Sequence, residues 1–142
     1  MRLRWPEEFD GWLRRVQSKS REGNAYYRRQ LELVAAALRM LRDLDSPPAE
    51  DTAGLKRVAQ SRKHQVWRTS HPFEEGIAVR LICWFPPASE EVVVALFAGE
   101  KARIGDVWYA RVGHRADMVI DQWLREQARQ VDSTRGEGDD DD

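Results

Sequence analysis

The stretch IAVRLICWFPPASEEVVVALFAGEKAR, residues 77–103, decides the fold of this chain. From Ile77 to Phe85 every second residue is apolar or cysteine, and alternate side chains of a β-strand lie on the same face. The alternation therefore predicts a strand with one buried face. Arg80 falls on the opposite face, together with Ile82 and Trp84.

The second half of the stretch predicts a turn and another strand. Residues 86–89, Pro-Pro-Ala-Ser, interrupt the first run with turn-forming side chains. Val92–Phe97 is then apolar on both faces, which is typical of a central strand. After Gly99 the chain continues to Lys101 and Arg103, so this strand brings positive charge to the edge of the sheet.

The composition is that of a globular domain. The chain has 142 residues, 42% hydrophobic and 33% charged, enough to bury a core without disulfides or a structural metal. The single cysteine, Cys83, has no partner for a disulfide, which fits a reducing cytoplasm. No segment reaches the roughly 18 apolar residues of a membrane span, and the charged start MRLRWPEEFD does not resemble a signal peptide. We expect a soluble, cytoplasmic protein.

Charge is unevenly distributed along the chain. The formal net charge is −1, with 23 basic and 24 acidic residues, but the last seven residues, GEGDDDD, hold five of the acids. The remaining chain has 23 basic against 19 acidic residues, a net charge of +4. Because the apolar pattern fades from Gln127 onward, we expect one domain over residues 1–128 and a disordered acidic tail over residues 129–142.

The N-terminal third predicts a strand and two helices. Residues 2–5 fit a short strand, and Pro6 suits the first turn of a helix, where its missing N–H would be unpaired anyway. An apolar stripe over residues 9–16 continues that helix. A second stripe, with spacings of three and four, predicts a long helix over residues 25–44.

The middle and end of the chain predict one more strand and further helices. If Trp67 faces the core, Arg68 faces the opposite side of its strand, which it then shares with Arg80. After residue 105, apolar residues at helical spacing predict two short helices divided at Gly113 and His114. The predicted fold is α+β: a small antiparallel sheet with N-terminal helices packed on one face, C-terminal helices, and the other face open to a ligand.

The sequence holds none of the common cofactor or metal motifs. It has no phosphate-binding glycine motif, no HExxH pair, no paired cysteines and no nucleophile elbow. His64, His71 and His114 match no ligand spacing and lie in or beside predicted loops, so we interpret them as surface histidines. We therefore expect neither a metal nor a cofactor.

A set of cationic residues carries the remaining chemistry. Its members are Arg68, Arg80, Lys101 and Arg103, followed downstream by Tyr109 and His114. Attack of a ribose 2′-hydroxyl on the adjacent phosphate needs a proton acceptor, cations around the phosphorus and a donor for the leaving oxygen. Arginine binds such an anion bidentately, and lysine, tyrosine or histidine can move protons. The set suffices for metal-free RNA cleavage, although arginines on strands are also common solubilising residues.

Three motifs around these cations resemble the RelE/ParE toxin superfamily, in particular the HigB-like, phage-derived toxins of bacterial toxin–antitoxin pairs. VWR supplies Arg68, AVRLICWF supplies Arg80 and LFAGEK supplies Lys101. The opening WPEEFDGWL is similar to the first strand and helix of that family, and the similarity extends to about Arg125. The resemblance implies a RelE-like fold.

The resemblance also implies an activity and partners. It points to a toxin that cuts mRNA on the ribosome, uses no metal or small-molecule cofactor, and is held inactive by a cognate antitoxin protein. Arg68 and Arg80 would then clamp the scissile phosphate, while Lys101 stabilises charge or accepts a proton.

Further residues would hold the RNA, and two other functions fit the same resemblance. The expected RNA-binding residues are Arg103, for the backbone, Tyr109 and His114, which stack a base or donate a proton, and the basic Lys56 and Arg62. The alternatives are a ParE-like protein that binds DNA gyrase and cleaves nothing, and a non-catalytic remnant that keeps only its antitoxin-binding surface.

Overall fold

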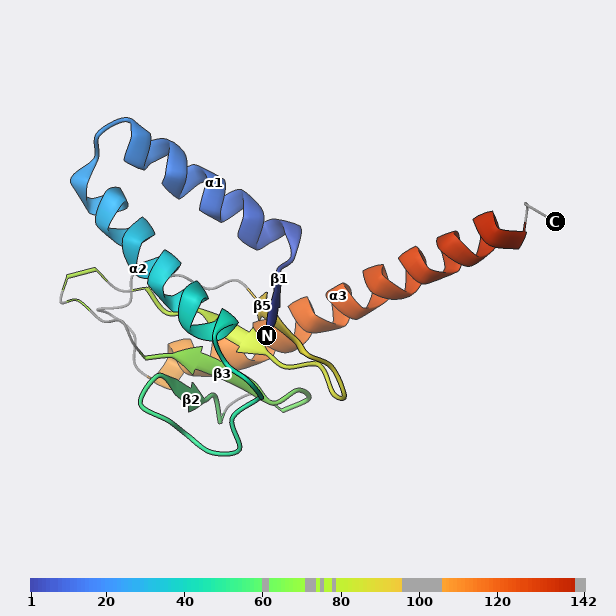
Figure 1. Ribbon diagram of the computed structural model, residues 1–142. Coiled ribbons are helices and arrows are strands. Elements are labelled where there is room, and N and C mark those ends of the chain that lie inside the picture. The colour runs from blue at the N-terminus through green and yellow to red at the C-terminus, as the bar shows by residue number, and fades with distance from the viewer. Residues whose placement is uncertain (60–61, 71–73, 75, 78, 96–105, 140–142) are drawn as a thin grey trace.

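The computed structural model describes residues 1–142 apart from 60–61, 71–73, 75, 78, 96–105 and 140–142, and at 95, 106–110 and 133–139 it describes the backbone alone. The elements in chain order are β1 (Arg2–Arg4), α1 (Glu7–Arg21), α2 (Ala25–Arg42), β2 (Leu55–Arg57), β3 (Val66–Thr69), β4 (Ile82–Trp84), β5 (Glu91–Ala95) and α3 (Asp106–Asp139). Figure 1 shows one sheet with helices around it. The predicted α+β class is confirmed.

The strands form one mixed sheet in the order β1-β5-β4-β3-β2. Neighbours from β2 to β5 are antiparallel, whereas β1 pairs with β5 in parallel, with Arg2 opposite Glu91 and Arg4 opposite Val93. The prediction of a wholly antiparallel sheet is therefore wrong at this edge. Parallel neighbours need a long connection, and here two helices and three strands lie between β1 and β5 along the chain.

α1 and α2 form a hairpin whose ends follow the local sequence. Three acids lie in the first turn of α1, where they interact favourably with the helix dipole. The chain turns at Gly23, whose φ of 90° costs little without a Cβ. Asn24 then caps α2, because its side-chain oxygen accepts hydrogen bonds from the backbone N–H groups of Tyr26 (3.0 Å) and Tyr27 (3.3 Å).

The helical hairpin covers one face of the sheet and encloses the first core. Trp67 and Leu81 are buried in this core, as the alternation predicts. The alternating residues of the long predicted strand all lie in it or pack against it: Ile77, Val79, Leu81, Cys83 and Phe85. Only β4 is a regular strand within this stretch, yet the alternation of faces holds along the described part of it.

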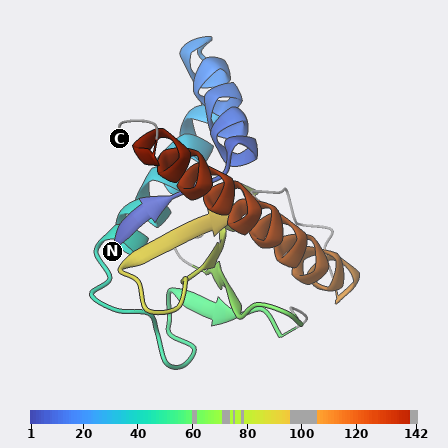
Figure 2. The same cartoon turned by 90° about the vertical axis from the view of Figure 1, so that its right-hand side faces the viewer.

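α3 covers the other face of the sheet and encloses a second core. The sheet contributes Val66, Ile82, Trp84 and Val93, and the helix contributes Val112, Ala116, Ile120 and Trp123. Figure 2 shows α3 crossing the sheet on the side away from α2. The prediction of one open face is wrong because β3, β4 and β5 carry apolar residues on both faces, and both faces must be removed from water.

The C-terminal helical part is one helix rather than the two predicted. α3 continues through Gly113 and His114 without a break. A glycine costs about 1 kcal/mol in a helix interior, and the burial of Val112 and Ala116 beside it offsets this cost. Within the described ranges, no helix has both the length and the apolarity to cross a membrane.

α3 extends beyond the sheet, which differs from the disordered tail predicted after residue 128. Its backbone is helical as far as Asp139, and Figure 1 shows this end projecting away from the other elements. Trp123 is the last buried residue among those described, and Val131 is 51% exposed. The packed part of α3 therefore ends near the predicted domain boundary, where the apolar residues that face the sheet run out.

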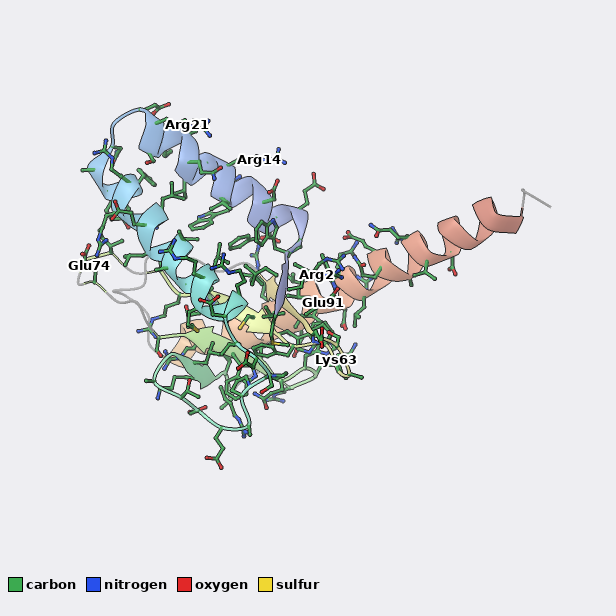
Figure 3. All side chains as sticks on the ribbon, viewed as in Figure 1. Arg2, Arg14, Arg21, Lys63, Glu74 and Glu91 are labelled. Atoms are coloured by element: carbon green, nitrogen blue, oxygen red, sulfur yellow. The ribbon has the colours of Figure 1, made fainter. Side chains whose placement is uncertain are left out.

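Two arginines connect β1 to its neighbours. Arg2 and Arg4 both pair with Glu91 of β5, and Figure 3 shows Arg2 next to Glu91. The hydrogen bond from Arg2 is the main reason that the pKa of the Glu91 carboxyl is lowered. The Arg4 guanidinium also lies 4.9 Å from the centroid of the Trp123 ring and donates a hydrogen bond to Gln127 of α3 at 3.1 Å. β1 thus joins the edge of the sheet to α3.

The substitution Ile120→Ala tests the second core. Ile120 is fully buried between α3 and the sheet, so its truncation should lower the free energy of unfolding by about 2–5 kcal/mol. Urea unfolding followed by circular dichroism measures the change. Met118→Ala on the same helix is the matched control, because Met118 is 59% exposed, and its effect should stay within about 0.5 kcal/mol. Equal stability of the two variants would contradict the packing of α3 on the sheet.

Candidate nucleic-acid interface

Two of the predicted cations face each other at the edge of the sheet. Lys56 of β2 and Arg68 of β3 are cross-strand partners, and Arg68 is also the partner of Ile82 in β4. Leu55 and Trp67 belong to the first core and Ile82 to the second, so Lys56 and Arg68 lie on the α3 face. Both side chains are half-buried.

Arg80 lies beside this pair. The Thr69 N–H donates to the Leu81 carbonyl at 2.9 Å, and the Leu81 N–H donates to the Thr69 hydroxyl at 2.9 Å,. The pairing with β3 therefore extends to Leu81, just before the start of β4. Val79 and Leu81 both lie in the first core, and the alternation of side chains puts Arg80 on the α3 face. Arg80 is half-buried. We call Lys56, Arg68 and Arg80 the cationic row.

The cationic row has the chemistry of a phosphate site. Opposite side chains on one face of an antiparallel pair have Cβ atoms about 5 Å apart, and like charges at this separation repel. Partial burial strengthens their field, since less water screens it. An anion bound to both Lys56 and Arg68 gains charge-assisted hydrogen bonds from each and reduces their repulsion. The cationic row therefore offers positive charge and N–H donors of the kind that bind a phosphate.

Three further predicted residues belong to the segment after β5. Lys101 and Arg103 lie outside the described residues. Ala95 ends β5 as the partner of Ile82, in the same transverse row of the sheet as Lys56 and Arg68. Tyr109 belongs to the first turns of α3, of which the backbone alone is described. The last described residue of β5 thus lies at the level of Lys56 and Arg68, six positions before Lys101 in the chain.

His114 lies in a separate groove. It is exposed and lines a hollow of about 670 Å³ between the start of α1 and α3, together with Glu7 and Met118. Glu8 and Arg115 form an ion pair between the same two helices. None of the cationic row lines this groove among its described residues. The structure therefore does not join His114 to the predicted catalytic arginines.

A buried carboxylate fastens residues 62–64 to α3. Asp117 is 8% exposed, and its oxygens accept hydrogen bonds from the backbone N–H groups of Arg62 (3.2 Å), Lys63 (3.1 Å) and His64 (3.0 Å). These donors satisfy a charge whose burial would otherwise be costly. Arg62, a predicted RNA-binding residue, has its backbone fixed here and its side chain exposed.

One helical turn further along α3, Asp121 binds two side chains of the same loop. Its Oδ2 lies 2.8 Å from Lys63 Nζ and its Oδ1 lies 3.0 Å from His64 Nε2. These hydrogen bonds, the one from Lys63 first, lower the pKa of the Asp121 carboxyl. The His64 ring also meets Trp84 edge to face, with centroids 5.3 Å apart. We call these contacts of Asp117 and Asp121 with residues 62–64 the loop clamp.

The loop clamp was not predicted from the sequence. His64 is expected there to be a surface histidine, whereas its side chain is only 14% exposed. The available signal is the spacing of Asp117 and Asp121, four residues apart within an apolar helical stripe and hence on one face. Acids on a buried helical face need cationic or N–H partners, and the basic run at residues 62–64 supplies both.

Neither a metal centre nor a reactive thiol is found in the described part of the chain. Over that part, no group of three or more His, Cys, Asp or Glu side chains is arranged to hold a metal ion. Cys83 is fully buried in the first core, and this burial raises the pKa of its thiol. A buried, protonated thiol is a poor nucleophile.

No protein-family model, curated protein or solved structure matches this chain. Family membership therefore supplies no functional residues. Function is therefore inferred from the side chains of the cationic row and the loop clamp.

The loop clamp should make stability depend on acid pH. The pKa of Asp121 is lower in the folded chain than in the unfolded one. Its ion pairs therefore stabilise the fold fully above the unfolded value of about 4, and the contribution is lost as the pH falls through the folded value. Asp121→Asn should lower the free energy of unfolding at pH 6 and lower it by less at pH 3, because the contribution of the ionised carboxylate decreases as the pH falls below the unfolded value. Urea titrations at the two pH values measure this.

The exposed Asp132, farther along α3, provides the control for this prediction. Asp132→Asn removes one carboxylate from the same helix without touching the loop clamp, so it should follow the parent at both pH values. An Asp121→Asn chain as stable as the parent at pH 6 would mean that the ion pairs to Lys63 and His64 add nothing to the fold.

Proposed function

We propose that this chain is the toxin component of a toxin–antitoxin pair and cleaves mRNA on the ribosome without a metal ion. The observation that carries the proposal is the cationic row: Lys56, Arg68 and Arg80 share one face of the sheet, beside which β5 ends six positions before Lys101 in the chain. Cations that converge in this way stabilise the charge that develops on a phosphate under attack. The resemblance to HigB-like toxins supports the same activity.

The proposed reaction is an internal transesterification of RNA. The 2′-oxygen attacks the neighbouring phosphorus, the bond to the 5′-oxygen breaks, and the products carry a 2′,3′-cyclic phosphate and a 5′-hydroxyl. Arg68 and Arg80 bind the non-bridging oxygens. Lys101 stabilises charge or accepts the 2′-proton. Tyr109, which is nearer to Lys101 in the sequence than His114 is, donates a proton to the leaving oxygen. Arg103 holds the RNA backbone.

α3 restricts the route by which RNA reaches this site. The helix covers the centre of the face, where it buries Trp84 and Val93. β2 is the last strand of the sheet, and its Lys56 is half-buried. RNA would therefore approach over the β2 edge and meet Lys56 before Arg68, which differs from the open platform expected from the sequence.

A ParE-like protein that binds DNA gyrase without cleaving nucleic acid is the second candidate. The observation in its favour is α3, which covers much of the sheet face and presents exposed Leu124 (42%) and Val131 (51%). Leu124 and Val131 are seven residues apart and so share one face of the helix, where a partner protein could cover both. The same surface fits a non-catalytic chain that keeps only antitoxin binding. In each case we propose a cytoplasmic protein with an antitoxin partner.

The substitution Arg80→Ala should abolish growth inhibition and RNA cleavage while leaving the chain folded. Loss of one contact to the transition state lowers the rate by on the order of a hundredfold or more. Mapping of the 5′ ends of cellular mRNA after induction measures the cleavage. Arg39→Ala is the matched control, because Arg39 is an exposed arginine of α2, far from the α3 face.

The outcomes of this experiment separate the candidates. Cuts within translated codons that disappear in Arg80→Ala but persist in Arg39→Ala support the ribonuclease. DNA breaks with intact mRNA support the gyrase inhibitor. A folded Arg80→Ala chain with undiminished cleavage would show that Arg80 has a structural role only.

A further inference from the structure

A pocket of about 390 Å³ opens at the end of the sheet where β3 begins and β4 ends. Its lining contains three cationic or basic side chains, Arg57, Lys63 and His64, and three aromatic ones, Trp67, Trp84 and Phe85. Prolines from two loops complete the wall. This pocket shares no residue with the cationic row.

The aromatic side chains give the pocket an apolar floor. Trp67 and Trp84 are 4% and 6% exposed, so each presents only a small part of its ring to the pocket. Phe85 is half-buried and is more accessible. Aromatic surfaces attract planar rings, and nucleobases bind to them with little dependence on base identity.

Two of the cationic side chains are held in place by neighbouring residues. The Arg57 guanidinium lies 5.4 Å from the centroid of Trp67, and its backbone N–H donates to Asp51 at 2.9 Å. Lys63 is held by Asp121 at 2.8 Å. The described lining of the pocket contains no acidic side chain, but Asp121 outside it compensates part of the Lys63 charge, so Arg57 supplies most of the net positive charge. The pocket therefore offers cations for an anionic group and aromatic side chains for a planar ring attached to it.

We propose that this pocket binds a ribonucleotide, with the base against Phe85 and the accessible parts of the two tryptophans and the phosphate between Arg57 and Lys63. The proposal rests on the proposed RNA substrate and adds to it a second contact point. Arg57 and Trp67 are cross-strand partners one residue along the strands from the Lys56–Arg68 pair, with their side chains on the other face of the sheet. An RNA strand that crosses the β2 edge can therefore place one nucleotide in the pocket and another at the cationic row.

Indole N–H correlations in nuclear magnetic resonance spectra test the pocket without any cleavage. The chain has six tryptophans, of which Trp67 and Trp84 report on this site. Addition of AMP or UMP to the full chain should shift these two resonances, ribose 5-phosphate should bind more weakly, and inorganic phosphate should leave the indoles unshifted. Arg57→Gln and Lys63→Gln should each weaken nucleotide binding about tenfold through the loss of one charge-assisted contact.

Two controls keep this experiment decisive. Arg21→Gln, at the far end of the helical hairpin (Figure 3), removes the same charge away from the pocket and should bind as the parent does. Arg57→Lys keeps the charge and should recover most of the affinity. A tetranucleotide with a 2′-deoxy scissile position that binds more tightly than AMP identifies RNA as the ligand, whereas equal affinity identifies a free nucleotide.

The results also distinguish failure of the pocket from failure of the proposed function. Unshifted Trp67 and Trp84 resonances at millimolar nucleotide, or undiminished binding by Arg57→Gln and Lys63→Gln, would overturn the pocket even if the parent cleaves mRNA. Nucleotide binding that survives in Arg80→Ala and weakens in the pocket variants upholds the pocket even if no cleavage is found.

Discussion

The constraint on which this structure depends is that three neighbouring strands are apolar on both faces. Val66, Ile82, Trp84 and Val93 point away from the helical hairpin and would meet water if nothing covered them. Burial of each such side chain contributes about 1.5–3 kcal/mol. α3 supplies that cover with Ile120 and Trp123, and the loop clamp and Arg4 hold it in position. With the hairpin alone, the apolar side chains on the other face of the sheet would be exposed to water.

This constraint also determines where function can be located. The centre of both faces is occupied by packing, so the described polar side chains gather at the edges and ends of the sheet. The cationic row and the proposed nucleotide pocket use adjacent residue pairs of β2 and β3, with side chains on opposite faces. A short edge strand with charged side chains also resists pairing with other chains, so the same residues limit aggregation.

The local patterns of the sequence predict local structure well. Alternation from Ile77 to Phe85, the burial of Trp67 and the two N-terminal helices follow from side-chain spacing alone. The pattern could not reveal what α3 packs against, because a helical stripe specifies a face and not its partner. β2 escaped prediction because three residues, LKR, carry too little alternation. The parallel pairing of β1 depends on contacts across nearly ninety positions, and the burial of His64 depends on acids from another element.

The loop clamp changes how positive charge can act in this chain. Residues 62–64 are a basic run, but their backbone N–H groups donate hydrogen bonds to Asp117. The side chains of Lys63 and His64 bind Asp121. These charges are therefore largely compensated within the fold, and the positive field at the β2 edge arises mainly from Lys56, Arg57, Arg68 and Arg80. So few cations give weak, salt-sensitive attraction to RNA by themselves. The proposed cleavage would then require that another body, such as the ribosome, bring the strand to the edge, because positioning would replace the long-range attraction that this surface lacks.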